Sequence, residues 1–148
     1  MKKYLIIAAF LCGFQVSSNA QENVVIVSDA WSRPITIEGR PGGAYLNISN
    51  QTEEADQLLS VSSTVSPRLE IHEHSMTDGV MKMSRVDFVE IPANQKVEFK
   101  PGGYHIMIFD SKKYEIGDDF ELVLTFKNAG DIATKVQVSM KKPNLMNE

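Results

Sequence analysis

The stretch "IHEHSMTDGVMKM", from Ile71 to Met83, predicts a strand, a tight turn and a returning strand. Polar and apolar residues alternate from Arg68 to His74, which is the period of a half-buried strand. Thr77-Asp78-Gly79 then gives a turn signal, and strand-forming residues resume from Val80 to Val89. The turn makes the two strands antiparallel neighbours, so a histidine of the first should lie near a methionine of the second.

The rest of the chain repeats this pattern of short strand-forming runs, separated by turns that contain glycine or proline. The other predicted strands are Val24–Val27, Ala44–Ile48, a weaker Leu58–Val65, Lys96–Phe99, Tyr104–Phe109, Phe120–Phe126 and Thr134–Met140. No segment shows a helical stripe, and neither an internal repeat nor a linker interrupts the series. Eight or nine short strands in this length predict one all-β domain, a sandwich or Greek-key barrel.

Residues 1–20 have the pattern of an export signal. Lys2 and Lys3 give a basic start, an apolar run follows, and Ser18-Asn19-Ala20 supplies the small residues of a cleavage site before Gln21. A retained N-terminal anchor is the alternative, although the apolar run is short for a span. We therefore expect an exported, soluble domain over residues 21–148, with no membrane span once the signal is cleaved.

Composition excludes several kinds of function. The chain has 19 acidic against 15 basic residues, and this acidic balance argues against nucleic acid as a partner. Its single cysteine, Cys12, would leave with the signal, so the mature chain would have no disulfide, thiolate nucleophile or thiolate metal ligand. No hydrolase, zinc-peptidase or phosphate-loop motif is present, so we expect no enzyme activity.

Histidine and methionine are instead concentrated on three predicted strands. Alternate residues of a strand point to the same face, so each strand can present a pair of these side chains on one side. The pairs are His72 with His74, Met81 with Met83, and His105 with Met107. The opposite faces carry the apolar residues Leu69, Ile71, Ile106 and Ile108. The apolar faces should pack inward while the histidines and methionines face elsewhere.

Imidazole and thioether together favour one metal ion over others. Thioether sulfur is soft and neutral and prefers Cu(I), whereas zinc sites use histidine, cysteine and carboxylate. A neutral ligand set leaves the single charge of Cu(I), which is easier to hold in a partly apolar site than a double charge. Without an anionic thiolate the metal can be released to a partner, which indicates a carrier.

The same residues resemble a known family. The spacing of His72, Met83, His105 and Met107 matches the H-x10-M-x21-H-x-M signature of the periplasmic PCu(A)C copper chaperones. Ten residues separate the first two, twenty-one separate the middle two, and one separates the last two. The segments "IPANQKVEFKPGGYHIM", "AWSRPI" and "GGAYLNISN" are also similar to that family. The resemblance implies a cupredoxin-like β-barrel in the periplasm that binds one Cu(I) through His72, Met83, His105 and Met107. It also implies delivery of copper to the CuA centre of cytochrome c oxidase, with subunit II or a thiol-bearing assembly factor as the acceptor.

Two other functions stay open at the level of sequence. The protein could buffer copper or confer resistance without a dedicated acceptor, or it could be an exported β-sandwich that only binds other proteins. The roles of His74, Met76 and Met81 are open as well. His74 could assist or bind Cu(II), Met81 could pack beside the site, and Met76 could belong to an exposed soft patch.

Overall fold

The computed structural model describes residues 24–142, so the predicted signal, its cleavage site and Cys12 lie outside the described residues. The described chain is all-β, and within it no helix is long and apolar enough to cross a membrane. Its strands are β1 Val25–Ser32, β2 Gly42–Asn50, β3 Asp56–Ser62, β4 Arg68–Thr77, β5 Val80–Arg85, β6 Val89–Ile91, β7 Lys96–Phe99, β8 Tyr104–Phe109, β9 Asp119–Phe126 and β10 Gly130–Val138.

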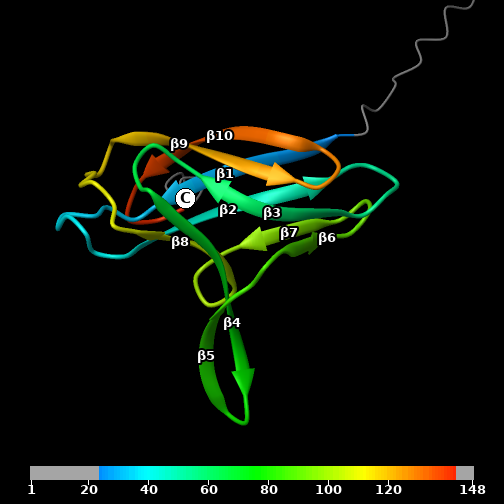
Figure 1. The fold of residues 1–148 in the computed structure, drawn as a ribbon, viewed down its shortest axis with the longest axis horizontal. Coiled ribbons are helices and arrows are strands. Elements are labelled where there is room, and N and C mark those ends of the chain that lie inside the picture. The colour runs from blue at the N-terminus through cyan, green and yellow to red at the C-terminus, as the bar shows by residue number, and fades with distance from the viewer. Residues whose placement is uncertain (1–23, 143–148) are drawn as a thin grey trace, which may run out of the picture.

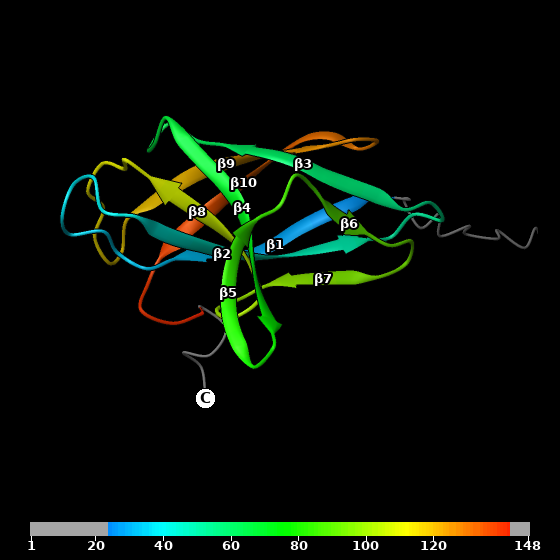
Figure 2. The same cartoon turned by 60° about the horizontal axis from the view of Figure 1, so that its bottom comes forward.

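All ten strands belong to one sheet that curls around a single core (Figures 1 and 2). The order across the sheet is β5-β4-β8-β2-β1-β10-β9-β3-β6, and β7 pairs with β2 off this path. Every pairing is antiparallel except β1 with β10, which run parallel with Trp31 opposite Gln137. The first and last strands of the described chain therefore lie side by side.

Strand alternation fills the core as the sequence predicts. Ile71 of β4 and Ile106 of β8 lie directly opposite each other, and both are buried. Ile108 is fully buried, and its partner Leu69 packs against the same core. Burying such a side chain contributes about 1.5–3 kcal/mol relative to leaving it exposed. The apolar faces of β4 and β8 thus turn inward, which leaves their histidines and methionines on the other face.

One predicted strand is divided in the structure. The sequence predicts a single strand over Val80 to Val89, but β5 ends at Arg85 and β6 begins at Val89. The backbone N–H of Val86 donates to the carbonyl of Ile71 at 2.9 Å, which ends the pairing with β4. Val89 is then buried opposite Leu58 of β3. The chain leaves one edge of the sheet for the other because Val86 and Val89 both pack against the core.

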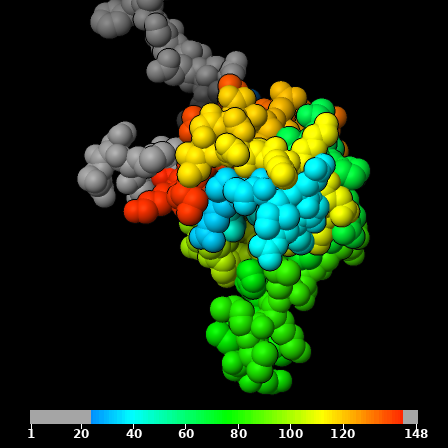
Figure 3. All heavy atoms as spheres, turned by 90° about the vertical axis from the view of Figure 1, so that its left-hand side faces the viewer, coloured from blue at the N-terminus to red at the C-terminus, as the bar shows by residue number. Residues whose placement is uncertain are grey.

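The hairpin of β4 and β5 projects from the body of the molecule (Figures 1 and 3). Its turn residues Asp78 and Gly79 both have positive φ, 52° and 76°, and Thr77 pairs with Val80 across them. Two central residues with positive φ are the requirement of a type I′ turn, whose twist matches that of the strands. Every residue of β5 is exposed, so this edge of the sheet has no covering layer within the described chain.

A short irregular segment separates β7 from β8 and shapes the surface next to the hairpin. Both strands pair antiparallel with β2, β7 along its second half and β8 along its first. Between them, the Gly103 N–H donates to the Lys100 carbonyl at 3.0 Å and the Lys100 N–H to the Tyr104 carbonyl at 2.8 Å. The carbonyl of Gly103 also accepts the backbone N–H of His74 at 3.2 Å. This segment is thereby fixed against β4.

Candidate metal centre

Pairing of β4 with both β5 and β8 brings the histidines and methionines together. His72 lies directly opposite His105 of β8, and His74 lies directly opposite Met83 of β5. Met107 lies two residues beyond His105, opposite Gly43 of β2. Because opposed residues of neighbouring strands point to the same side, these side chains share one face of the sheet. The pairing of β8 with β4 thus places a third strand beside the predicted hairpin.

A cavity of about 370 Å³ opens on this face. Met83, His105 and Met107 line it, and so does His74. The remaining lining residues are Arg33, Pro34, Ile35, Pro41, Gly42, Gly43, Tyr45 and Pro101. His72 lies beside the cavity rather than in its lining, with its ring centroid 5.9 Å from that of His105.

The ring of His105 is oriented by the backbone. Its Nδ1 lies 2.9 Å from the carbonyl oxygen of Gly103, and a carbonyl can only accept, so Nδ1 carries the proton. Nε2 of the neutral ring is then left with its lone pair. Burial lowers the pKa of His105, the nearby His74 and His72 lower it further, and the Gly103 hydrogen bond opposes the shift. His105 is therefore a neutral imidazole at neutral pH, as a metal ligand must be.

His72 is oriented by a carboxylate two residues earlier on the same face. Its Nε2 lies 2.8 Å from Oε2 of Glu70, and this hydrogen bond is the main cause of the lowered pKa of Glu70. An ionised carboxylate can only accept, so Nε2 of His72 donates. Nδ1 of His72 is buried without a hydrogen-bond partner. A buried nitrogen with a free lone pair and no partner is costly, and a metal ion would satisfy it.

His74 belongs to the β4–β5 hairpin and lines the cavity. Its ring stacks on that of His105, with centroids 4.8 Å apart and planes inclined by 23°. Its Nδ1 is also buried without a hydrogen-bond partner. The structure thus places His74 in the cavity lining, a position that the sequence pattern alone did not determine.

Several residues at the site were not assigned to it from the sequence. Glu70 could have been found by alternation, since it is two residues before His72 on the same face. Gly43, Tyr45 and Pro101 come from other strands and turns, so only the tertiary fold brings them to the cavity. Gly43 lies directly opposite Met107, and a Cβ at Gly43 would lie 3.1 Å from the hydroxyl oxygen of Tyr45, so its lack of a side chain makes room for the Tyr45 ring.

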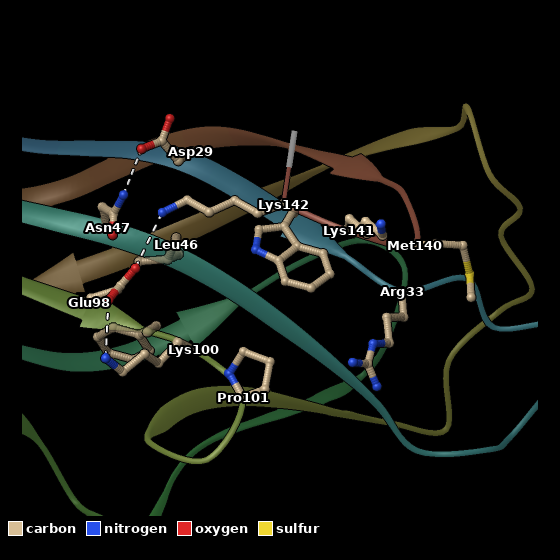
Figure 4. A pocket seen from close by; sticks show the side chains of 12 residues that line it. Asp29, Arg33, Leu46, Asn47, Glu98, Lys100, Pro101, Met140, Lys141 and Lys142 are labelled. Carbon is tan, nitrogen blue, oxygen red and sulfur yellow. Dashed lines mark hydrogen bonds and ion pairs between the residues drawn. The ribbon is translucent and has the colours of Figure 1, made fainter. Parts of the chain in front are cut away.

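A second cavity, of about 310 Å³, lies next to the first and shares Arg33 and Pro101 with it (Figure 4). Trp31 lines the second cavity and packs against Tyr45 of the first, with ring centroids 4.7 Å apart and planes tilted by 36°. Glu98 here is paired with two lysines, Lys100 and Lys142, each at 3.3 Å, and both hydrogen bonds lower its pKa. The two lysines thus balance the negative charge of the Glu98 carboxylate.

The histidine and methionine face can hold a soft monovalent cation. It offers imidazole nitrogens without hydrogen-bond partners beside uncharged thioether sulfurs, and imidazole and thioether are ligand types that bind Cu(I). In residues 24–142 no three His, Asp or Glu side chains are grouped so as to hold a metal ion. The methionines therefore distinguish this arrangement from an ordinary site of nitrogen and oxygen ligands.

Solved structures share the fold. A copper-bound PCuAC domain from PmoF2 superposes with a TM-score of 0.65 and 24% identity, over 79% of this chain and 93% of that domain. The Cu(I) form of DR1885 from Deinococcus radiodurans gives a TM-score of 0.62 and 22% identity, over 85% of this chain and 84% of the other. The predicted all-β, cupredoxin-like fold class is thereby confirmed.

Sequence comparison identifies the family. The sequence model described as "Putative lipoprotein LpqE-like" matches residues 25–138. Uncharacterized protein RP573 of Rickettsia prowazekii (strain Madrid E) is 31% identical over 139 residues, which cover 86% of this chain and 77% of the relative. The match includes every strand of the sheet and all the histidines and methionines of the candidate centre. The chain therefore belongs to the LpqE-like family.

Proposed function

We propose that the protein is a copper chaperone that carries one Cu(I) ion bound by His72, Met83, His105 and Met107. The observation that carries this proposal is the register of β4, β5 and β8, which puts these side chains on one face around or beside one cavity. The fold it shares with a copper-bound PCuAC domain and with Cu(I)-DR1885 supports the assignment. The matching spacing of the four residues supports it as well.

The ligand atoms follow from the hydrogen bonds of the two rings. His105 would bind through Nε2, because Nδ1 donates to Gly103. His72 would bind through Nδ1, because Nε2 donates to Glu70. The sulfurs of Met83 and Met107 would complete the set without adding charge. Copper stays monovalent throughout, and a partner with thiolates can remove it by ligand exchange.

The exposure of the site suits a carrier. His72 and His105 are only 8% and 4% exposed, whereas Met83 is 48% exposed. The imidazoles therefore lie at the base of the centre and one thioether lies at its surface, where an acceptor can reach the metal. We propose that the protein works in the periplasm, is not an enzyme, and delivers copper for the CuA centre of cytochrome c oxidase. The acceptor would be subunit II or a thiol-bearing assembly factor.

Anaerobic titration with Cu(I) against a colorimetric chelator tests this function. We expect one tight equivalent for the wild-type protein, and an affinity reduced by about tenfold or more in Met83→Leu and in Met107→Leu, because leucine keeps the volume but removes the soft ligand. Met140→Leu is the matched control, since Met140 is exposed and lies outside the cavity. Full affinity in both ligand variants would refute the assignment.

A further inference from the structure

We propose that Met76 and Met81 form an outer Cu(I) site through which metal reaches and leaves the inner centre. The proposal rests on the proposed function, because the outer site has a role only if the inner centre holds copper. It is carried by one juxtaposition: Met76 of β4 and Met81 of β5 lie directly opposite each other, one pair further along the hairpin than His74 and Met83.

The two methionines face the same side as the inner centre. Met76 is two residues beyond His74, and Met81 is two residues before Met83, so alternation puts all four on one face. Directly opposed residues of antiparallel strands have Cβ atoms about 4.5–5.5 Å apart. Two flexible methionine side chains at this spacing can bring both sulfurs to one ion.

Both methionines are strongly exposed. Met76 is 67% exposed and Met81 is 58% exposed, and Val80 at the turn is exposed beside them. Both methionines lie on the hairpin that projects from the body of the protein (Figures 1 and 3). Methionine normally fills gaps in a core, so packing does not account for these two. Metal exchange accounts for a pair of exposed thioethers next to a soft-metal centre.

The chemistry of transfer requires only ligand substitution. Cu(I) bound by the sulfurs of Met76 and Met81 would form a bond to the Met83 sulfur as the bond to Met76 breaks. Met81 and Met83 are about 7 Å apart along the strand, a distance that two flexible side chains can bridge. Bonds to the imidazoles then replace the bond to Met81. No electron or proton moves, and the two imidazole ligands make the inner centre the tighter site.

Methyl NMR of the purified protein with 13C-methyl methionine tests the outer site, with Ag(I) as a probe that does not change oxidation state. We expect the first equivalent to shift the Met83 and Met107 methyl signals and a second, weaker equivalent to shift those of Met76 and Met81. In the double variant Met76→Leu/Met81→Leu the first equivalent should bind as before, and the second should be lost. Met140→Leu should keep both equivalents.

Loading kinetics test the transfer role. When Cu(I) is supplied as a chelator complex, the double variant should load the inner centre severalfold more slowly than the wild-type protein and reach the same final occupancy. Unshifted Met76 and Met81 methyl signals, or loading at the wild-type rate, would overturn the proposal. A first equivalent that leaves Met83 and Met107 unshifted would instead contradict the proposed function, so the two failures are distinguishable.

Discussion

At the residue scale, two hydrogen-bond acceptors orient the histidine rings of the candidate centre. The carbonyl of Gly103 holds the proton of His105 on Nδ1, and the carboxylate of Glu70 holds that of His72 on Nε2. Each acceptor leaves the other ring nitrogen free to coordinate. The ring orientations are thus set in the metal-free protein, which reduces the ordering that the proposed copper binding requires.

Replacing Glu70 tests this orientation. We expect Glu70→Gln to lower the Cu(I) affinity by about tenfold, because the amide is a weaker partner for His72 and can hold either tautomer. The competitive titration measures the change. Glu73→Gln is the matched control, since Glu73 is on the same strand but on the opposite face. Equal affinities for Glu70→Gln and the wild type would show that the carboxylate does not prepare the ligand.

The two histidines of β4 can be separated in the same assay. We expect His72→Gln to weaken Cu(I) binding strongly and His74→Gln to weaken it less, because only His72 has a carboxylate that fixes its ring. His74 lines the cavity and also has a buried Nδ1 without a hydrogen-bond partner. Comparing the two variants therefore shows which of the two histidines contributes more to Cu(I) binding. The reverse order of effects would move the ligand assignment from His72 to His74.

At the element scale, sequence patterns predicted the hairpin and its faces but not how the sheet is closed around them. Alternation and the Asp78-Gly79 turn were sufficient for β4 and β5, since both are local. The division of Val80 to Val89 into two strands depends on where Val89 is buried, against Leu58, and that contact is distant in sequence. The cavity residues Tyr45 and Pro101 were missed for the same reason.

Adding a single methyl group at Gly79 should destabilise the turn of the hairpin. Gly79 has φ 76°, so Gly79→Ala should destabilise the hairpin by about 1–2 kcal/mol, the cost of a left-handed conformation for a residue with a Cβ. Faster amide hydrogen exchange in β4 and β5 would report it, together with weaker Cu(I) binding. Asp78→Asn is the control, because asparagine tolerates positive φ. Unchanged exchange in Gly79→Ala would contradict the argument.

At the scale of the whole molecule, the fold class was predictable because strand-forming runs and turns recur along the chain. The order of strands was not, since the parallel pairing of β1 with β10 leaves no local pattern in the sequence. Grouping the residues of the proposed ligand set required both the local pattern and the tertiary pairing. Alternation assigned each histidine and methionine to a face, and the pairing of β4 with β8 brought the faces together.

The stability of the metal-free protein should decline on mild acidification. Burial keeps the pKa of His105 below the 6.5 of an unfolded chain, so as the pH falls through this range the unfolded state takes up the proton first. The free energy of unfolding therefore decreases below about pH 6.5. Urea denaturation at about pH 7.5 and about pH 5.5 measures the decrease, which should be smaller in His105→Gln. An equal decrease in that variant would assign the effect to other groups.

The parallel pairing of the first and last described strands bears on when the protein can fold. β1 lies between β2 and β10 in the sheet, so the pairing of Trp31 and Ser32 with β10 cannot form until Gln137 and Val138 have been synthesised. A nascent chain emerging from the ribosome therefore cannot complete its sheet early. Completion of this sheet therefore waits for a contact between residues far apart in the chain, which is the kind of contact that slows folding.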